Sequence, residues 1–486
     1  MKNSKIALLG VGALMAGCSW LEPRLTLPKF MVPDSYNAAG QSTPLDFVSP
    51  TETGSWQVAE ARVAEPRGNW WEIYNDPQLN ELMQQALVES PNLQVMAARV
   101  KQARAQAGLA ESALWPMIYG DASVKRQRLA PGELQQSDNA TSKPLTTHRV
   151  GLTASYELDL FGRLTGDARQ ARFGSLAQED LYESTKLSLQ ADVVQAYFAA
   201  RTAGVVLADI SETLALGEKS LRLAKRMYEL GDIPSQQYQQ NVADLMTLRN
   251  DALDVQRQRL AASNQLALLL GKMPGSVVIS DTTALQTLPP MIPAGVPASL
   301  LERRPDVAAA QNQLKAANAG IGAARAAFFP RIELTGTGGY AAQDMSNLFK
   351  SNTASWSVGP ALTLPIFQGA TNLSNLRRSW GLYEESVAAY KQQVLTAFAD
   401  VDDALAGHRI TLEQASGQQQ ARVELDKTSA MAERQLALGD IGMADYNQIR
   451  QQALIGRINE QQTLYNAYAA SAQLVRALGG GWETKE

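Results

Sequence analysis

Hydrophobic and polar residues alternate along this chain with two different periods, and the shorter period predicts strands. From Arg149 to Leu160 every even-numbered residue is apolar, and every odd-numbered residue is polar or Gly. The segments 118–125, 331–335 and 355–366 show the same period of two. Unbroken alternation predicts strands with one apolar and one polar face. The four strands are roughly ten residues long, which is the length that a tilted strand needs to cross a bilayer.

A soluble sheet with one buried face has the same alternation, so the neighbouring segments decide between the two. No Pro lies between Gly166 and Leu230, and apolar residues recur there at alternating steps of four and three. The positions are Leu189, Val193, Ala196, Ala200, Ala203, Leu207, Ile210, Leu214, Gly217, Leu221, Ala224 and Tyr228. A sustained repeat of about 3.5 residues predicts the seam of a coiled coil. The many Ala at this seam favour walls of closely packed helices over a globular core.

Several short segments of the chain occur twice, in the same order. Their displacements are 214, 214, 206, 208 and 208 residues. The pairs are Pro91 and Pro305, Trp115-Pro116 and Phe329-Pro330, Leu160-Phe161 and Ile366-Phe367, 230–233 and 438–441, and Leu270-Gly271 and Leu478-Gly479. Displacements that change only where loops change length indicate a tandem duplication, and the units are far too long for a solenoid repeat. In the first copy the chain turns at 231–234 and a return helix is expected up to Leu270. The long helix and its return helix are therefore expected again over 369–438 and up to Leu478.

Four strands from one chain cannot stand alone in a bilayer, because each strand needs a partner on both sides. Two copies would give eight strands, whose interior side chains fill, whereas three copies would give twelve and leave a lumen. We therefore predict a mixed α and β membrane protein. Its strands would close with those of further copies of the chain into a barrel, twelve-stranded for three copies, and the coiled helices would continue the tube away from the membrane as a hollow cylinder. The residues expected to face the lumen are Arg149, Thr153, Ser155, Glu157 and Asp159.

The start of the chain has the pattern of a bacterial lipoprotein signal. Lys2 and Lys5 precede an apolar run from Ile6 to Ala16, which is too short to span a bilayer, and Gly17-Cys18 follow. Cleavage before Cys18 would leave it as the lipidated N-terminus. Cys18 is also the only cysteine, so an intrachain disulfide is excluded. Ser19 at the next position favours sorting to the outer membrane.

We divide the chain into six parts on these grounds. The parts are 1–17 as the signal peptide, 18–75 as an extended N-terminal segment, 76–274 as repeat one, 275–298 as a Pro-rich linker, 299–478 as repeat two and 479–486 as a C-terminal tail. Loss of Lys2 and Lys5 leaves 42 basic residues (44 − 2) against 48 acidic ones. The mature net charge of −6 argues against a nucleic-acid partner, which requires a basic face.

Several blocks of the sequence resemble the outer membrane factors of bacterial tripartite efflux pumps, in their lipoprotein branch. The blocks are 156–163 (YELDLFGR), 301–306 (LERRPD), 321–330 (IGAARAAFFP), 364–367 (LPIF) and 477–482 (ALGGGW). The resemblance implies a homotrimer that passes small toxic compounds and drugs to the outside. Its fold would be a trimeric twelve-stranded β-barrel in the outer membrane, four strands per chain, continued by a long coiled-coil α-helical periplasmic tunnel. It also implies a periplasmic adaptor and an inner-membrane resistance-nodulation-division transporter as partners. A covalent lipid on Cys18 is the only expected bound group.

An enzyme is not expected, because the only His and Cys residues are His148, His408 and Cys18, with no partner at metal-ligand spacing. Neither a catalytic residue nor a metal site is predicted. Two other functions share this architecture, namely a type I secretion outlet for proteins and a non-transporting envelope spacer. Lipidation and the closing Gly-Gly-Gly-Trp block resemble the pump branch and favour efflux.

The two Leu-Gly-Asp-Ile turns are expected to dock the adaptor. The turn residues are Gly231, Asp232, Ile233, Gly439, Asp440 and Ile441. Related proteins often have Leu and Asp five and nine residues beyond the turn Gly, but this chain has Ala444 and Gln448 there. Asp445 is the best substitute, and Arg450 is expected to hold the closed state by pairing with an acidic neighbour. The candidate gate is therefore Asp445, Tyr446, Gln448 and Arg450. Ordinary solvated helix-end charges remain the alternative.

Overall fold

The computed structural model describes residues 21–25, 68–128, 144–279, 284–285, 287–289, 292 and 303–480. Cys18 and the residues that follow Gly480 lie outside these ranges. The elements are η2 (Trp70–Tyr74), α2 (Pro77–Glu89), α3 (Pro91–Ser112), β1 (Met117–Gln127), β2 (Leu145–Leu158), α4 (Arg163–Leu230), α5 (Ser235–Leu269), α7 (Pro305–Ala326), β3 (Arg331–Ala342), η4 (Met345–Asn347), η5 (Ser351–Thr353), β4 (Ala354–Thr363), α8 (Thr371–Leu438) and α9 (Met443–Ala477).

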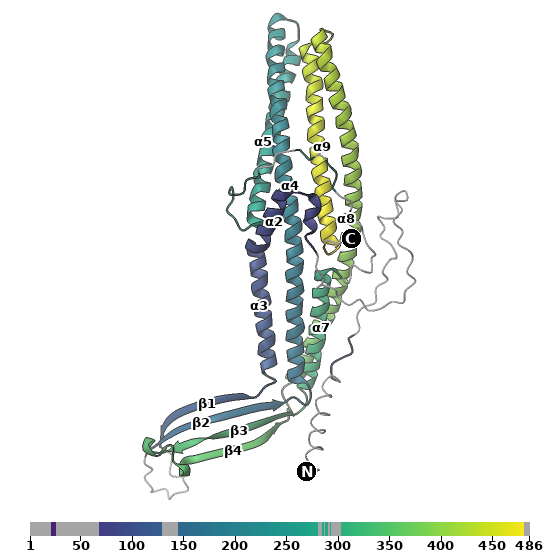
Figure 1. The fold of residues 1–486 in the computed structure, drawn as a ribbon. Helices are drawn as coiled ribbons and strands as arrows, with labels where there is room; N and C mark the ends of the chain where they lie inside the picture. Colours follow the sequence, from purple (N-terminus) through teal and green to yellow (C-terminus); the bar gives the residue numbers. More distant parts are fainter. Residues whose placement is uncertain are drawn as a thin grey trace. The chain divides into compact units, whose positions relative to one another are not determined.

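The order helix, strand, strand, long helix and return helix occurs twice along the chain (Figure 1). The long helices α4 and α8 each contain 68 residues, and the return helices α5 and α9 each contain 35. Equal lengths in both copies are what a duplicated gene segment produces. The helix expected from Gly166 begins slightly earlier, at Arg163, and the one expected from Gly369 begins at Thr371.

The chain forms two compact units, and each unit takes segments from both copies of the repeat. One unit contains residues 21–25 with Val100–Ala177 and Ala310–Tyr390, including all four strands. The other contains 68–99, Gln178–Ala309 and 391–480. A single copy therefore does not form a compact body of its own. We call these the strand unit and the helical unit.

The strand unit contains one antiparallel sheet with the strand order β1-β2-β3-β4. Leu152 of β2 lies opposite Gly120 of β1 and Gly338 of β3, and Gly338 lies opposite Trp356 of β4. Every pair in the three registers joins two even-numbered or two odd-numbered residues. Because directly opposed residues point to the same side, the even-numbered residues of all four strands share one face. The alternation read from the sequence thus becomes one apolar and one polar sheet face.

Two strand ends differ from the sequence prediction. β2 ends at Leu158 rather than Leu160, because the next residue caps a helix, as described below. β4 ends at Thr363 rather than Ile366, and Pro365, which has no N–H to donate, lies just beyond it. Alternation therefore continued in the sequence for two or three residues after the hydrogen-bonded ladder had stopped.

The core of the helical unit lies around α4 and includes Trp71, Phe198, Leu266 and Leu464, each at most 2% exposed. The predicted seam positions of α4 are buried or half-buried down to Ala224, whereas Tyr228 near the helix end is 43% exposed. Among the described helices, α4 alone is long and apolar enough to cross a membrane, but 61% of its most apolar stretch is buried. A core helix has the same properties. Asp76 caps α2 by accepting a hydrogen bond from the Leu79 N–H at 3.0 Å.

Candidate functional site

The odd-numbered face of the sheet carries the polar residues that were expected to line a lumen. Arg149, Thr153, Ser155 and Glu157 all belong to β2 and share this face. On the same face Thr337 of β3 and Ser357 of β4 are joined by a hydrogen bond of 2.8 Å between their hydroxyl oxygens. The opposite face exposes Ile118, Leu152, Trp356 and Val358, as well as Leu362. The sheet is therefore amphipathic across its whole width.

Asp159 was expected to be a lumen-facing strand residue, but its placement in the strand is wrong. It lies one residue beyond β2, and its carboxylate accepts hydrogen bonds from the backbone N–H groups of Leu164 and Thr165 at 3.1 and 2.7 Å. It also accepts one from the Thr165 hydroxyl at 2.7 Å. The first N–H groups of a helix have no partner within the helix, so a carboxylate placed there stabilises it. Asp159 therefore fixes the connection from β2 into α4.

The two hairpin turns are built alike. Gly231 and Gly439 have φ angles of +84° and +80°, a conformation that Gly adopts without strain. The N–H groups of Asp232 and Asp440 donate back to the carbonyl oxygens of Met227 and Gln435, at 2.8 and 2.9 Å. This pattern closes the ends of the long helices. Asp232 and Asp440 are exposed, and the preceding residues, Leu230 and Leu438, are each 77% exposed.

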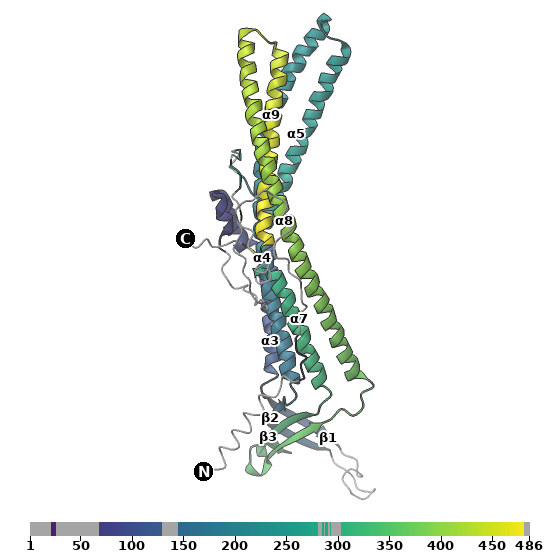
Figure 2. The same cartoon turned by 90° about the vertical axis from the view of Figure 1, so that its right-hand side faces the viewer.

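The turns α4–α5 and α8–α9 lie at the same end of the helical unit (Figures 1 and 2). Each therefore presents an apolar Leu and a carboxylate on the same side of that unit. Ile233 and Ile441, the last residues of the two motifs, are half-buried. A small exposed surface that combines apolar and acidic groups is suited to contact with another protein.

Near the second turn, Arg450 forms an ion pair that crosses from one copy of the repeat to the other. Its Nη2 donates to Glu212 Oε1 of α4 at 2.8 Å, and this hydrogen bond raises the pKa of Arg450. Asn447, which is 4% exposed, donates to the Ser220 hydroxyl at 3.0 Å and joins the same two helices. The sequence did not single out Asn447, although its counterpart in the first copy, Gln239 (447 − 208), is exposed.

The other candidate gate residues have different surroundings. Asp445 accepts a hydrogen bond of 3.4 Å from the Gly442 N–H and caps α9. Tyr446 is half-buried and Gln448 is exposed. Of the four candidates, only Arg450 is joined to the other copy of the repeat by a described contact.

Each hairpin is also held by an ion pair of its own. Arg249 contacts Glu218 at 2.9 Å between α5 and α4, and Arg457 contacts Asp426 at 3.3 Å between α9 and α8. Both residues of the second pair lie 208 positions after those of the first. Arg450 instead has Val242 as its counterpart (450 − 208), so the contact between copies has no equivalent in the first hairpin.

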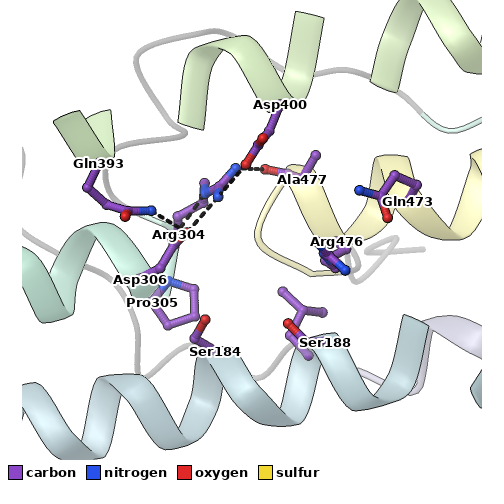
Figure 3. Close-up of a pocket in the computed structure, with 11 residues that line it drawn as sticks. Ser184, Ser188, Arg304, Pro305, Asp306, Gln393, Asp400, Gln473, Arg476 and Ala477 are labelled. Carbon is purple, nitrogen blue, oxygen red and sulfur yellow. Dashed lines mark hydrogen bonds and ion pairs between the residues drawn. The ribbon is translucent and has the colours of Figure 1, made fainter. Parts of the chain in front are cut away.

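A polar pocket of about 170 Å³ lies in the helical unit where α7 begins (Figure 3). Arg304, which is 7% exposed, lies at its centre and donates to Asp306 at 3.0 and 2.5 Å and to Asp400 of α8 at 2.9 Å. It also donates to the carbonyl oxygen of Ala477, at the end of α9, at 3.1 Å. Burial opposes the charge of Arg304, but the bonds and charges of Asp306 and Asp400 outweigh it and raise its pKa. The group ties three helices of the second copy together.

Comparison with known proteins identifies the family. A family profile described as outer membrane efflux protein matches residues 82–272 and 296–480. The chain belongs to this family. The probable efflux pump outer membrane protein TtgC of Pseudomonas putida is 32% identical over 489 residues, which cover 99% of this chain and 96% of that protein. The cation efflux system protein CusC of Escherichia coli is 30% identical over 486 residues, covering 99% and 100%.

A solved structure agrees with this assignment. The CmeC outer membrane channel of Campylobacter jejuni superposes with a TM-score of 0.82 over 96% of each chain, and at 24% identity it shows the fold alone. The family predicted from the sequence is thus confirmed, together with the assignment to the outer membrane and to efflux. The expected lipidation at Cys18 lies outside the described residues and stays a prediction.

In this efflux protein Leu21 and Glu22, near the start of the described residues, are bound to helices of the strand unit. Glu22 accepts hydrogen bonds from Arg169 of α4 at 2.9 Å and from Asn318 of α7 at 3.0 Å. Arg325 of α7 donates to the carbonyl oxygen of Leu21 at 2.9 Å. These hydrogen bonds thus join helices from both copies of the repeat to the start of the described chain. Sequence reasoning missed them because no periodic signal marks these residues.

His408 of the efflux protein lies in α8, is 6% exposed, and has no hydrogen-bond partner for either ring nitrogen among the described residues. Burial lowers its pKa below the usual value of about 6.5. As the pH falls below about 6.5, the unfolded chain therefore binds a proton that the folded chain resists, and stability is lost. We expect His408→Leu to reduce this acid destabilisation, measured as the difference in unfolding temperature between about pH 7.5 and about pH 5.5. An unchanged difference, or an equal effect of His148→Gln, would contradict this.

The described ranges show no metal centre. They contain no group of three or more His, Cys, Asp and Glu side chains placed to hold a metal ion. The proteins that this chain resembles are channel and efflux proteins by name. That the protein has no enzymatic activity stays a prediction from the sequence.

Proposed function

We propose that three copies of this efflux protein form one outer membrane duct, through which drugs and other small toxic compounds leave a tripartite pump. The observation that carries the proposal is the register of the sheet. It gives four strands a continuous apolar face and a continuous polar face, and it leaves β1 and β4 at the two edges of the described sheet.

Closure of the barrel follows from the cost of unpaired strand edges in a bilayer, where no water satisfies their backbone groups. Three copies supply twelve strands (3 × 4) and enclose a lumen, whereas eight strands would be filled by side chains. The apolar face then contacts lipid, and Arg149, Thr153, Ser155 and Glu157 line the passage. In this proposal the helical unit lies in the periplasm.

The partners in this proposal are a periplasmic adaptor and an inner-membrane transporter of the resistance-nodulation-division class. The adaptor docks on the turns around Gly231 and Gly439, where exposed Leu230 and Leu438 offer apolar contacts. The carboxylates of Asp232 and Asp440 add a charge that an adaptor can match. Support comes from TtgC and CusC, whose names place them in an efflux pump and an efflux system.

The test is a transport assay in cells that lack their own outer membrane efflux proteins but contain an adaptor and a pump. Expression of this protein should restore extrusion of a fluorescent dye and resistance to small toxic compounds. Restored release of a protein substrate of a type I system, without dye extrusion, would instead establish a secretion outlet. If the protein is correctly inserted but transports neither dye nor protein, the result would favour a non-transporting envelope spacer.

We further propose that the pair Arg450–Glu212 holds the periplasmic end closed. The two side chains are 26% and 46% exposed, so each pair contributes no more than about 1 kcal/mol. Three pairs per trimer at about 0.5 kcal/mol each would shift the balance between closed and open states roughly tenfold. Arg450→Ala combined with Asp445→Ala should therefore increase single-channel conductance and the uptake of large antibiotics several-fold.

Arg249→Ala is the matched control for this gate. Arg249 pairs with Glu218 at a similar distance of 2.9 Å, but within one hairpin. Its loss should leave conductance and antibiotic uptake unchanged. If the double variant behaves like this control, or if Arg249→Ala opens the channel equally, the closed state does not depend on the contact between copies of the repeat.

Lipidation of Cys18 is the remaining part of the proposal, and the signal pattern before this sole cysteine supports it. Two or more acyl chains, at about 0.8 kcal/mol per buried methylene, would anchor the N-terminus stably in the membrane. Mass spectrometry of the purified protein should find Cys18 as a modified N-terminus. Cys18→Ser should still allow trimers to form, because the strands hold the protein in the membrane. An unmodified Cys18 or a retained Met1 would refute lipidation.

A further inference from the structure

Two aromatic rings meet in the strand unit where the two copies of the repeat join. The rings of Phe161 and Phe329 are stacked, with centroids 4.7 Å apart and planes inclined by 18°. Phe161 follows β2 and Phe329 precedes β3, and these two strands pair with each other. The stack therefore lies at one end of the β2–β3 pair, in which β2 comes from the first copy of the repeat and β3 from the second.

The equivalents of these two residues lie at the opposite edges of the sheet. The repeat displaces Phe161 by 206 residues to Phe367, which follows β4, and Phe329 by 214 residues to Trp115, which precedes β1. Phe367 is 89% exposed and Trp115 is 73% exposed in the single chain. β4 and β1 are also the two strands that have a partner on only one side in the described sheet.

We propose that Phe367 of one copy stacks on Trp115 of the next copy, and so repeats between chains the contact that Phe161 and Phe329 make within one chain. The inference rests on the proposed trimer, in which β4 must pair with β1 of a neighbour. The interface between copies is then built like the interface between repeats. The partner is a second copy of this chain, and the aromatic pair lies at the strand end where both chains pass into helices.

The duplication explains why a ring contact is expected rather than two separate exposed rings. Within one chain β2 pairs with β3. In the proposed trimer β4 of one chain would pair with β1 of the next chain in the equivalent way. Offset stacking removes two large apolar surfaces from water and adds a preferred ring geometry. The alternative is that the two rings contact the lipid headgroup region, where aromatic residues of membrane barrels also gather. In that case the two rings would point outward and would not meet.

Engineered cysteines distinguish these arrangements, since Cys18 is the only native cysteine. We would combine Trp115→Cys with Phe367→Cys, treat the assembled protein in membranes with a short bis-maleimide, and analyse it on a denaturing gel. The double variant should yield covalent dimers and trimers at least tenfold above either single variant. The pair Phe161→Cys with Phe329→Cys is the matched control and should link within one chain at monomer mass.

The result that would overturn the proposal is an intact trimer by native mass spectrometry that gives no link between chains while the control pair does link. Absence of a trimer in the unmodified protein would instead refute the proposed assembly. If the cysteine variants fail to assemble, Trp115→Ala, Phe367→Ala and their combination replace them, with the heat dissociation of the trimer as the readout. Contact predicts that each single change lowers the dissociation temperature and that the second change adds little to the first. Additive effects would contradict it.

Discussion

Leu152→Lys should prevent stable insertion of the channel, whereas Thr153→Lys should leave it assembled. Leu152 is an even-numbered residue of β2, is 62% exposed, and has Gly120 and Gly338 as its direct neighbours. Neither directly opposed residue therefore has a side chain that could shield a charge placed there. A Lys on the lipid face near the middle of a barrel strand costs roughly 2–4 kcal/mol. With three copies the cost is roughly 6–12 kcal/mol per trimer, which is comparable to the whole stability of many proteins.

Thr153 is the matched control, because it is the next residue along the same strand and faces the polar side with Tyr119 and Thr337 as its direct neighbours. A Lys there points into water in the proposed lumen. The measurement is the fraction of protein that migrates as a folded, heat-modifiable species after refolding into lipid vesicles, compared for both variants. Equal tolerance of Lys at the two positions would show that the assignment of faces is wrong.

The sheet could be predicted from the sequence because a period of two specifies both the strand and its faces. The register adds that opposed residues always share parity, so the faces of four separate segments merge into two. Strand ends were predicted less well. Asp159 continues the polar alternation of β2, and only the structure shows that its carboxylate caps α4 instead. Alternation indicates the face on which a side chain lies, but the hydrogen bonds between strands determine where a strand ends.

The helices show a similar division between what local pattern determines and what packing determines. The 3.5-residue repeat and the two Leu-Gly-Asp-Ile motifs predicted the lengths of α4 and α8 and the positions of both turns. They did not predict which helices pack together, because the repeat identifies the buried face of a helix but not the helix that packs against that face. The contacts of Asn447 with Ser220 and of Arg450 with Glu212 depend on that choice. An acidic partner for Arg450 was expected, but its identity came only from the structure.

Arg304 carries the other large expected effect, since its guanidinium is buried and ties α7 to α8 and α9. Arg304→Ala would leave two carboxylates, those of Asp306 and Asp400, without their cation, and the carbonyl oxygen of Ala477 without its donor. Removal of one partner from a buried ion pair costs roughly 3–5 kcal/mol. Asp400 is partly exposed at 43%, so the lower part of this range is expected. The measurement is denaturant unfolding in detergent, followed by far-ultraviolet circular dichroism.

Two further variants distinguish the effect of losing the buried Arg304 network from the effect of removing any positive charge. Arg257→Ala removes a guanidinium that is 72% exposed and pairs with Asp254, and it should leave the stability almost unchanged. The variant Arg304→Met with Asp306→Asn and Asp400→Asn removes the network without leaving an unpaired charge. Neutral replacement of a complete buried ion pair is often tolerated, so it should be more stable than Arg304→Ala. If the triple variant is as unstable as Arg304→Ala, the hydrogen bond from Arg304 to Ala477 at the end of α9 matters more than the charges.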